Sequence, residues 1–272
     1  MNQLLLSHLF RRNQHPTSGL LYQVPPVGFQ ATTGEVSLQL TKRGPTANRL
    51  LAGLPSRDLE HFLARCESVE LILADVLCVP GDPIHHVYFP TNSFISLVAP
   101  IDGYAGLEVG MIGNEGMFGI GLMLGVDVAA LHALVQGTGQ ALRMSARHFR
   151  RELEDSPALR RGLNRYVYVL ISQLAQTAAC TRFHVVEPRL ARWLSMTRDR
   201  AGSDEFHLTQ EFLAHMLGVR RVGVTEAARS LQERKLISYS RGVIKVLDRT
   251  GLEAAACGCY LDDKRTYERI LG

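Results

Sequence analysis

The sequence predicts an α+β protein in which a region of short strands, a long helix and a winged helix-turn-helix follow one another. Short apolar runs separated by turn residues fill residues 68–144. A long helical pattern begins at Pro157, and residues 208–250 combine two shorter helical patterns with a basic, alternating segment. A chain of 272 residues is long enough to form two domains with separate cores.

Residues 1–47 mix Gly, Pro, Thr and Gln without a sustained period, so we expect a poorly ordered N-terminal extension. The opening segment, MNQLLLSHLFRRNQ, lacks a basic stretch before its apolar patch and a small-residue cleavage site after it. We therefore do not expect a signal peptide. Pro55 and Ser56 then start a short helix within residues 48–66.

Residues 68–144 are expected to form a β sandwich or barrel. The apolar runs VELILADVLCV, HHVYFP, SFISLVAP and LEVGMI are separated by Gly, Pro, Asp and Asn, and many short strands with regular turn signals are typical of these folds. The glycine-rich GNEGMFGIGLMLG allows tight turns and close backbone approach. Its spacing does not fit a dinucleotide-binding or P-loop motif, so neither is expected.

Residues 145–186 are expected to be helical. Ser145 starts a short helix, and Pro157 starts a long one. Six residues of the long helix recur at alternating steps of four and three: Leu163, Val167, Leu170, Leu174, Thr177 and Thr181. Such a heptad seam either pairs two subunits or packs within its own chain. The length of this helix, between two domains, favours a dimer interface.

Two helical patterns meet at Gly218. Thr209 is expected to cap the first helix, and Gly218 is expected to end it with a positive φ. The apolar positions are Phe212, Leu213, Met216 and Leu217 in the first helix and Val224, Ala227, Ala228 and Leu231 in the second. In SYSRGVIKVLD, apolar and polar residues alternate around Arg241-Gly242, which predicts a hairpin. This is the layout of a winged helix-turn-helix, which places its second helix in a DNA major groove.

Basic residues are concentrated in this segment. Residues 220–249 hold eight Lys/Arg against three Asp/Glu, whereas the whole chain carries only +4. Arg221, Thr225 and Arg229 share one face of the second helix, from which long donors reach base edges or phosphates. The other expected DNA contacts are Arg220, Arg241 and Lys245. A solvated helical hairpin with ordinary surface arginines is the alternative interpretation.

Four segments resemble one known superfamily when taken together. PGDPIHHVYFPTNSFISLV, GNEGMFG, LTQEFLAHMLGVRR and LQERKLISYSRG resemble the superfamily of the cyclic-AMP receptor protein and the fumarate-nitrate reductase regulator, over residues 48–250. The resemblance implies a cyclic-nucleotide-binding-like β-roll (jelly roll) over 48–150, a dimerisation helix over 151–186 and a winged helix-turn-helix over 187–272.

The resemblance also implies a homodimeric bacterial transcription regulator that binds a signal in the roll. We therefore expect a cytoplasmic homodimer that binds double-stranded DNA at an inverted-repeat operator, with RNA polymerase as a further partner. Neither a catalytic motif nor a stretch of ~18 apolar residues is present, so neither an enzyme nor a membrane protein is expected. The alternative is a sensor or interaction protein without a DNA role, for which a neutral C-terminal surface is expected.

Several positions depart from the superfamily's pattern. Ile120 stands where cyclic-nucleotide-binding members have a Glu for the ribose, and Leu131 and His132 stand where they have an Arg and a small hydroxyl residue for the phosphate. An apolar side chain cannot pair with a phosphate, so ordinary cyclic-AMP binding is not expected.

Two outcomes remain open for the roll. Its pocket, with candidate residues Glu115, Ile120, Leu131 and His132, either takes a different, unknown small-molecule effector or is a structural platform. In the recognition helix, the superfamily's Arg-Glu…Arg reads Arg221, Val222 and Glu226, so its usual operator is not assumed.

The five cysteines are scattered along the chain, which is typical of a reducing compartment. Cys257 and Cys259 form a close pair and Cys180 could approach them on folding, but no four-ligand spacing appears. His85 and His86 are neighbours in a predicted strand and point to opposite faces. We therefore expect no metal and no cofactor.

Overall fold

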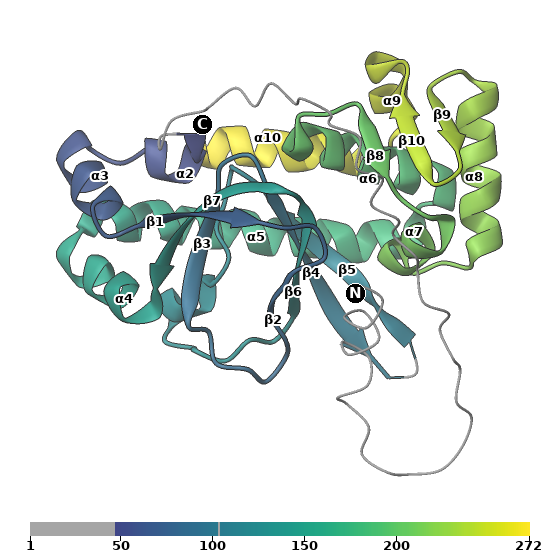
Figure 1. Cartoon of the computed structure of the whole chain (residues 1–272). Coiled ribbons are helices and arrows are strands. Elements are labelled where there is room, and N and C mark those ends of the chain that lie inside the picture. Colours follow the sequence, from purple (N-terminus) through teal and green to yellow (C-terminus); the bar gives the residue numbers. More distant parts are fainter. Residues whose placement is uncertain (1–46, 103) are drawn as a thin grey trace, which may run out of the picture. The chain divides into compact units, whose positions relative to one another are not determined.

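The computed structural model describes residues 47–102 and 104–272 (Figure 1). The predicted N-terminal extension lies outside these residues, apart from Ala47. Two short helices come first, α2 (Arg49–Ala52) and α3 (Ser56–Leu63), where the sequence predicted one. The Asn48 side-chain amide donates to the carbonyl oxygens of Pro90 and Gly116, each at 2.9 Å. These two bonds attach the start of the described chain to the strand region that follows.

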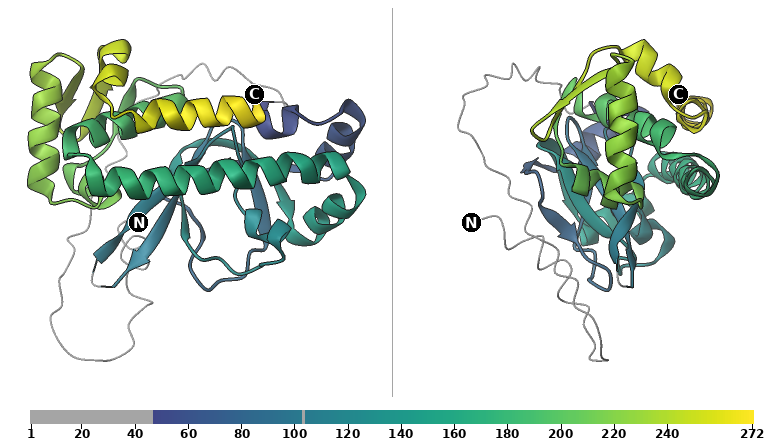
Figure 2. Two further views of the ribbon diagram at one scale, coloured as in Figure 1. Left: turned by 180° about the vertical axis from the view of Figure 1, so that it is seen from behind. Right: turned by 90° about the vertical axis from the view of Figure 1, so that its right-hand side faces the viewer.

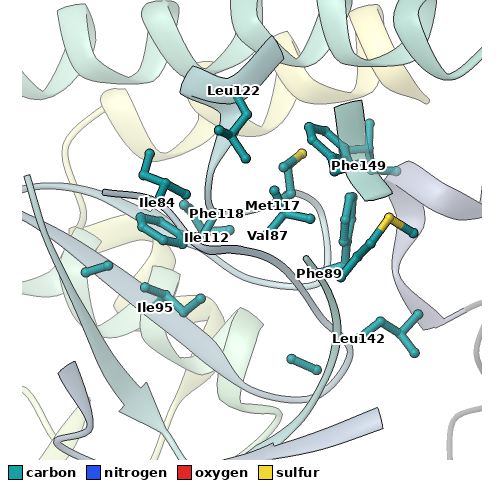
Figure 3. Close-up of a cluster of buried hydrophobic side chains, with 14 of the residues drawn as sticks. Ile84, Val87, Phe89, Ile95, Ile112, Met117, Phe118, Leu122, Leu142 and Phe149 are labelled. Carbon is teal, nitrogen blue, oxygen red and sulfur yellow. The ribbon is translucent and has the colours of Figure 1, made fainter. Parts of the chain in front are cut away.

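Seven strands form the predicted β-roll. They are β1 (Glu67–Leu71), β2 (Val76–Cys78), β3 (His86–Pro90), β4 (Phe94–Ile101), β5 (Tyr104–Ile112), β6 (His132–Gly137) and β7 (Gly139–Ser145). They pair antiparallel in two sheets, with the orders β1-β7-β3 and β2-β6-β4-β5. Phe89, Ile95 and Phe149 are among the buried side chains of their shared core (Figure 3). The sandwich prediction is therefore confirmed.

The glycine-rich segment packs tightly against the roll and the long helix. Gly119 has a φ of 94° and precedes the short 3₁₀ helix η2 (Ile120–Leu124). A Cβ at Gly116 would overlap the ring of Tyr166, whose hydroxyl donates to the Met117 carbonyl at 3.3 Å. Glycine is thus required here for close packing of the loop on the helix.

Helices α4 (Ala146–Asp155) and α5 (Pro157–Phe183) follow the roll. Ser145 and Ser156 cap them, and their hydroxyl oxygens accept hydrogen bonds from backbone amides at 3.3 and 3.1 Å. Leu163 and Leu170 of the predicted seam are buried in the core of the roll within the same chain. They pack against their own protomer and do not face outward.

The second core belongs to the C-terminal part of the chain. Its elements are α6 (Val186–Ala201), β8 (Glu205–His207), α7 (Gln210–Leu217), α8 (Arg221–Glu233), β9 (Ile237–Ser240), β10 (Val243–Val246), α9 (Arg249–Ala255) and α10 (Cys259–Leu271). Helices α7 and α8 with the β9-β10 hairpin confirm the winged helix-turn-helix. Strand β8 extends the hairpin to a three-stranded sheet, β8-β10-β9, which the sequence did not reveal.

Helix α10 runs back from the helix-turn-helix alongside α5 (Figure 2). Its Tyr267 ring lies under the Arg49 guanidinium, with 4.4 Å between the guanidinium carbon and the ring centroid. The polypeptide therefore joins the two cores twice, once through the α5–α6 connection and once through α10.

Candidate DNA-binding surface

The turn between α7 and α8 has the local geometry that the sequence predicted. Thr209 caps α7, its hydroxyl oxygen accepting from the Phe212 amide at 3.1 Å. Gly218 ends α7 with a φ of 61°, which L residues other than glycine seldom adopt. Val224 and Leu231 of α8 are fully buried against this unit. Their burial determines which face of α8 is exposed to solvent.

The exposed face of α8 carries the predicted donors. Arg221, Thr225 and Arg229 are all exposed. The Thr225 hydroxyl donates to Gln210 Oε1 at 2.7 Å, and the Arg229 guanidinium pairs with Glu233 at 2.8 Å. Arg229 is therefore already engaged with a carboxylate, whereas Arg221 at the first position of α8 is not paired with any described carboxylate.

Val222 belongs to the same surface, although sequence reasoning did not select it. Its side chain is 60% exposed next to Arg221. An apolar side chain at the start of a recognition helix can contact the methyl group of thymine. The available signal was its place next to Arg221, ahead of Val224, the first buried position of α8.

The wing is a two-residue hairpin. Ser240 pairs with Val243, and the residues between them, Arg241 and Gly242, have φ values of 50° and 81°. Two positive φ values in a two-residue loop define a type I′ turn. Arg241 at the tip and Lys245 on β10 are both exposed.

Four predicted DNA contacts lack an anionic partner inside the described part of the chain. No carboxylate in residues 47–102 or 104–272 forms an ion pair with Arg220, Arg221, Arg241 or Lys245. Their charges are free to meet an external polyanion.

The predicted effector residues lie in different surroundings. The Glu115 carboxylate pairs with Arg200 of α6 at 2.6 Å. Ile120 and Leu131 pack against the apolar core of the roll. His132 lies on β6, where burial lowers its pKa and its Nδ1 has no hydrogen-bond partner among the described residues.

A cleft lies between the glycine-rich segment and helices α5, α6 and α10. Its volume is about 150 Å³, and its lining comes from the glycine-rich segment, α5, α6 and α10. Glu115, Arg200 and Lys264 are among its charged lining residues. Of the four predicted effector residues, Glu115 alone lines this cleft.

A buried carboxylate links the roll to the DNA-binding part of the chain. Glu108 of β5 accepts from Trp193 Nε1 of α6 at 2.8 Å and from Ser96 Oγ at 2.5 Å. Burial raises the pKa of Glu108 to about 7, against the lowering effect of these hydrogen bonds and of two nearby arginines. The Glu108 carboxyl therefore changes its protonation state near neutral pH.

Glu108→Gln is expected to remove a pH dependence of folding. The pKa of Glu108 is about 7 in the folded state, which is higher than in the unfolded state. Protonated Glu108 therefore stabilises the fold. This contribution is complete below the unfolded-state pKa and is lost as the pH rises through 7. The wild type should lose up to about 3 kcal/mol more unfolding free energy than the variant on going from pH 5 to pH 8. Denaturant titration at both pH values measures this difference.

Glu154→Gln, at an exposed site on α4, is the control and should follow the wild type. Equal pH dependence in the wild type and Glu108→Gln would contradict the assigned role.

The structure also brings His184 to the three cysteines that the sequence had already considered together. The ligand atoms of Cys180, His184, Cys257 and Cys259 all lie within 4.8 Å of one another, so these cysteines are not scattered in the folded chain. Cys180 and His184 are four residues apart in a helical pattern, which was the available signal for two ligands on one helix face.

No helix in the described part of the chain is both long and apolar enough to cross a membrane.

Comparison with known proteins assigns the C-terminal segment. The profile of the Crp-like helix-turn-helix domain matches residues 188–255. No curated protein sequence gave a significant match to the chain.

Several solved structures share the fold. The c-di-GMP-responsive global regulator CLP of Xanthomonas campestris is 17% identical, with a TM-score of 0.59 over 71% of this chain and 100% of its own. A Crp/Fnr-family transcriptional regulator of Thermus thermophilus is 20% identical, with a TM-score of 0.56 over 70% of this chain and 98% of its own. FixK2 of Bradyrhizobium japonicum is 12% identical, with a TM-score of 0.59 over 71% and 98%. Residues 188–255 therefore form a Crp-like helix-turn-helix domain, carried on the fold of the Crp/Fnr-type transcription regulators.

Proposed function

We propose that the protein is a homodimeric transcription regulator that binds a specific DNA sequence. The observation that carries this proposal is the exposed face of α8 beside the wing, with four cations that no described carboxylate neutralises. A sensor without a DNA role gives no reason for these charges to gather around a recognition helix and its wing.

The position of each cation suggests its role. Arg221 is the first residue of α8, and the N-terminal residues of recognition helices contact base edges. A guanidinium pairs in a bidentate manner with guanine O6 and N7, so guanine is the expected base. Arg241 and Lys245 lie on the wing, from which contacts to DNA phosphates are expected. Arg220 directly precedes α8 and is also expected to contact the DNA backbone.

DNA titration tests this proposal. Fluorescence anisotropy is measured with the DNA upstream of the protein's own coding region and with a scrambled duplex of equal length, at two salt concentrations. We expect tighter binding to the upstream DNA, weakened steeply by salt because bound cations are released from the phosphates. Equal and weak binding to both duplexes would favour a protein without specific DNA recognition.

Removing the wing cations should affect both duplexes alike. Arg241→Ala and Lys245→Ala are expected to weaken specific and scrambled binding to a similar extent, and to lower the slope of log K against log salt by about 0.9 for each phosphate that the variant no longer neutralises. Arg265→Ala on α10, which is exposed and remote from the helix-turn-helix in sequence, is the charge-matched control and should leave the slope unchanged. A loss confined to the upstream DNA would show base contacts instead.

The dimer seam is proposed on the face of α5 that its own protomer leaves exposed. Tyr168 and Ile171 are 53% and 59% exposed, and Ala175 and Ala178 continue the same stripe. This stripe keeps the alternating steps of four and three but is displaced by one residue from the predicted seam. Exposed apolar side chains at heptad spacing are expected to pair with a second copy of the helix.

Two such protomers would present two copies of α8. With a twofold axis along the seam, each recognition helix would meet a half-site about one DNA turn, ~34 Å, from the other. An inverted-repeat operator follows from that symmetry.

Cyclic AMP is not expected to bind the roll in the usual way. Ile120 and Leu131 pack on the apolar core, where the cyclic phosphate would lose water without gaining a cation. Calorimetric titration with cyclic AMP and cyclic GMP should show no micromolar binding. Cyclic di-GMP is a further ligand to titrate, because the similar regulator of Xanthomonas campestris is described as responsive to it. Micromolar cyclic-AMP binding with a matching rise in DNA affinity would contradict this expectation, since such coupling is reciprocal.

A further inference from the structure

Four potential metal ligands gather where α5 ends and α10 begins. Cys180 lies in the last turn of α5 and His184 directly follows that helix, whereas Cys257 and Cys259 lie on either side of Gly258 at the start of α10. The one ligand atom that each offers lies within 4.8 Å of the other three. The three cysteines are buried, and His184 closes the group from the exposed side.

The spacing fits one tetrahedral ion. Cys180 Sγ lies 3.5 Å from Cys257 Sγ, and Cys259 Sγ lies 3.4 Å from His184 Nδ1. A zinc ion with bonds of ~2.3 Å to sulfur and ~2.0 Å to nitrogen holds its ligand atoms about 3.5–3.8 Å apart. A four-iron cluster would need a wider group, because each ligand binds a different iron. A Cys180–Cys257 disulfide would need its sulfurs at about 2.05 Å.

We propose that Cys180, His184, Cys257 and Cys259 bind one structural zinc ion. Three cysteines and one histidine are a ligand set of structural zinc sites, and four protein ligands leave no open position for a reacting molecule.

The surroundings of the site suit a negatively charged centre. Three thiolates on a divalent ion leave one net negative charge. Arg189 is buried close by, and no carboxylate in the described ranges pairs with it. Burial lowers the pKa of Arg189, because a buried cation loses its solvation by water. An anionic zinc centre would therefore compensate a buried cation that is otherwise costly.

Outer contacts hold the ligands in place. The Gln176 side-chain amide donates to Cys259 Sγ at 2.9 Å, and the Cys257 backbone amide donates to the Pro188 carbonyl at 3.3 Å. Such second contacts orient the ligands of metal sites. Arg189 in turn donates to the carbonyl of Leu217 at the end of α7. The ion would thus tie α5, α10 and the helix-turn-helix together at one point.

Metal analysis of the full-length protein tests the proposal. The protein is purified under reducing conditions without chelator, and its metal content is measured before and after incubation with zinc and desalting. We expect one zinc per chain in the incubated protein and less than a tenth of that in Cys259→Ser. Cys66→Ser, at a cysteine outside the cluster, is the matched control and should retain one zinc.

Cobalt provides a second readout that also guards against misfolding of the cysteine variant. Co²⁺ in place of zinc should give the strong visible bands and thiolate charge-transfer absorption of a tetrahedral site. His184→Gln changes an exposed ligand without opening the core, and should weaken cobalt and zinc binding at least tenfold while the circular dichroism stays unchanged.

Three results would overturn the assignment. One is a reduced, folded wild type that takes up neither zinc nor cobalt. Another is a metal-free protein in which Cys180 and Cys257 form a disulfide. The third is iron and acid-labile sulfide in place of zinc.

Discussion

Ile171→Asp is expected to convert the proposed dimer into monomers and to abolish operator binding. Ile171 is at the middle of the exposed α5 stripe, and a carboxylate there would meet its own symmetry mate in an apolar seam. A buried, unpaired carboxylate costs several kcal/mol, and each protomer of the pair would contribute one. Sedimentation velocity at micromolar concentration measures the change in mass, and anisotropy with operator DNA measures the loss of binding.

Two further variants separate the seam from the fold. Arg165→Asp places a carboxylate at an exposed position of α5 that flanks the stripe without belonging to it, and should remain dimeric. Leu170→Asp should instead unfold the roll, because Leu170 belongs to its core. A monomeric wild type at micromolar concentration, or a dimeric Ile171→Asp protein, would refute the proposed seam.

Arg221→Ala is expected to lower specific affinity by about 1–3 kcal/mol, or about 5- to 150-fold, and to relax the base preference at one position of each half-site. The reason is that Arg221 begins α8 without a described carboxylate partner, so its donors remain available for a base edge. Competition binding with operators changed at single base pairs measures both effects.

Arg229→Ala is the matched comparison on the same helix face. Its guanidinium is held by Glu233, so its loss should cost less than the loss of Arg221. If Arg221→Ala weakened binding to every duplex equally, Arg221 would be a phosphate contact and not a base contact.

The helix-turn-helix was predictable because its signals are local. A threonine cap at Thr209, a positive φ at Gly218 and a two-residue turn at Arg241-Gly242 each depend on a few neighbouring residues. The structure reproduces all three. Strand β8 has only three residues, too few for a period to show, and it is held by pairing with β10.

The α5 helix was predictable, but its outward face was not. Adjacent stripes beginning at Leu163 and at Asn164 have the same spacing, and the first is the more apolar. Leu163 and Leu170 pack into the roll core. Only the tertiary structure reveals this. The less apolar stripe, which begins at Asn164, therefore stays exposed and is the one proposed to pair with a second copy of the helix.

The cysteine-histidine cluster could not be found as a linear motif. Cys180 and Cys257 are separated by 77 residues, and α10 brings them together by folding back along α5. Each half has closely spaced ligands, Cys180 with His184 and Cys257 with Cys259, but the packing of α10 along α5 was needed to join them.

Selection of bound duplexes from a random DNA pool by the purified full-length protein tests the central claim most directly. The proposal predicts enrichment of an inverted repeat with half-sites about one DNA turn apart, and loss of that enrichment with Arg221→Ala. Selection that enriches no common sequence, from a folded and dimeric protein, would contradict sequence-specific DNA binding.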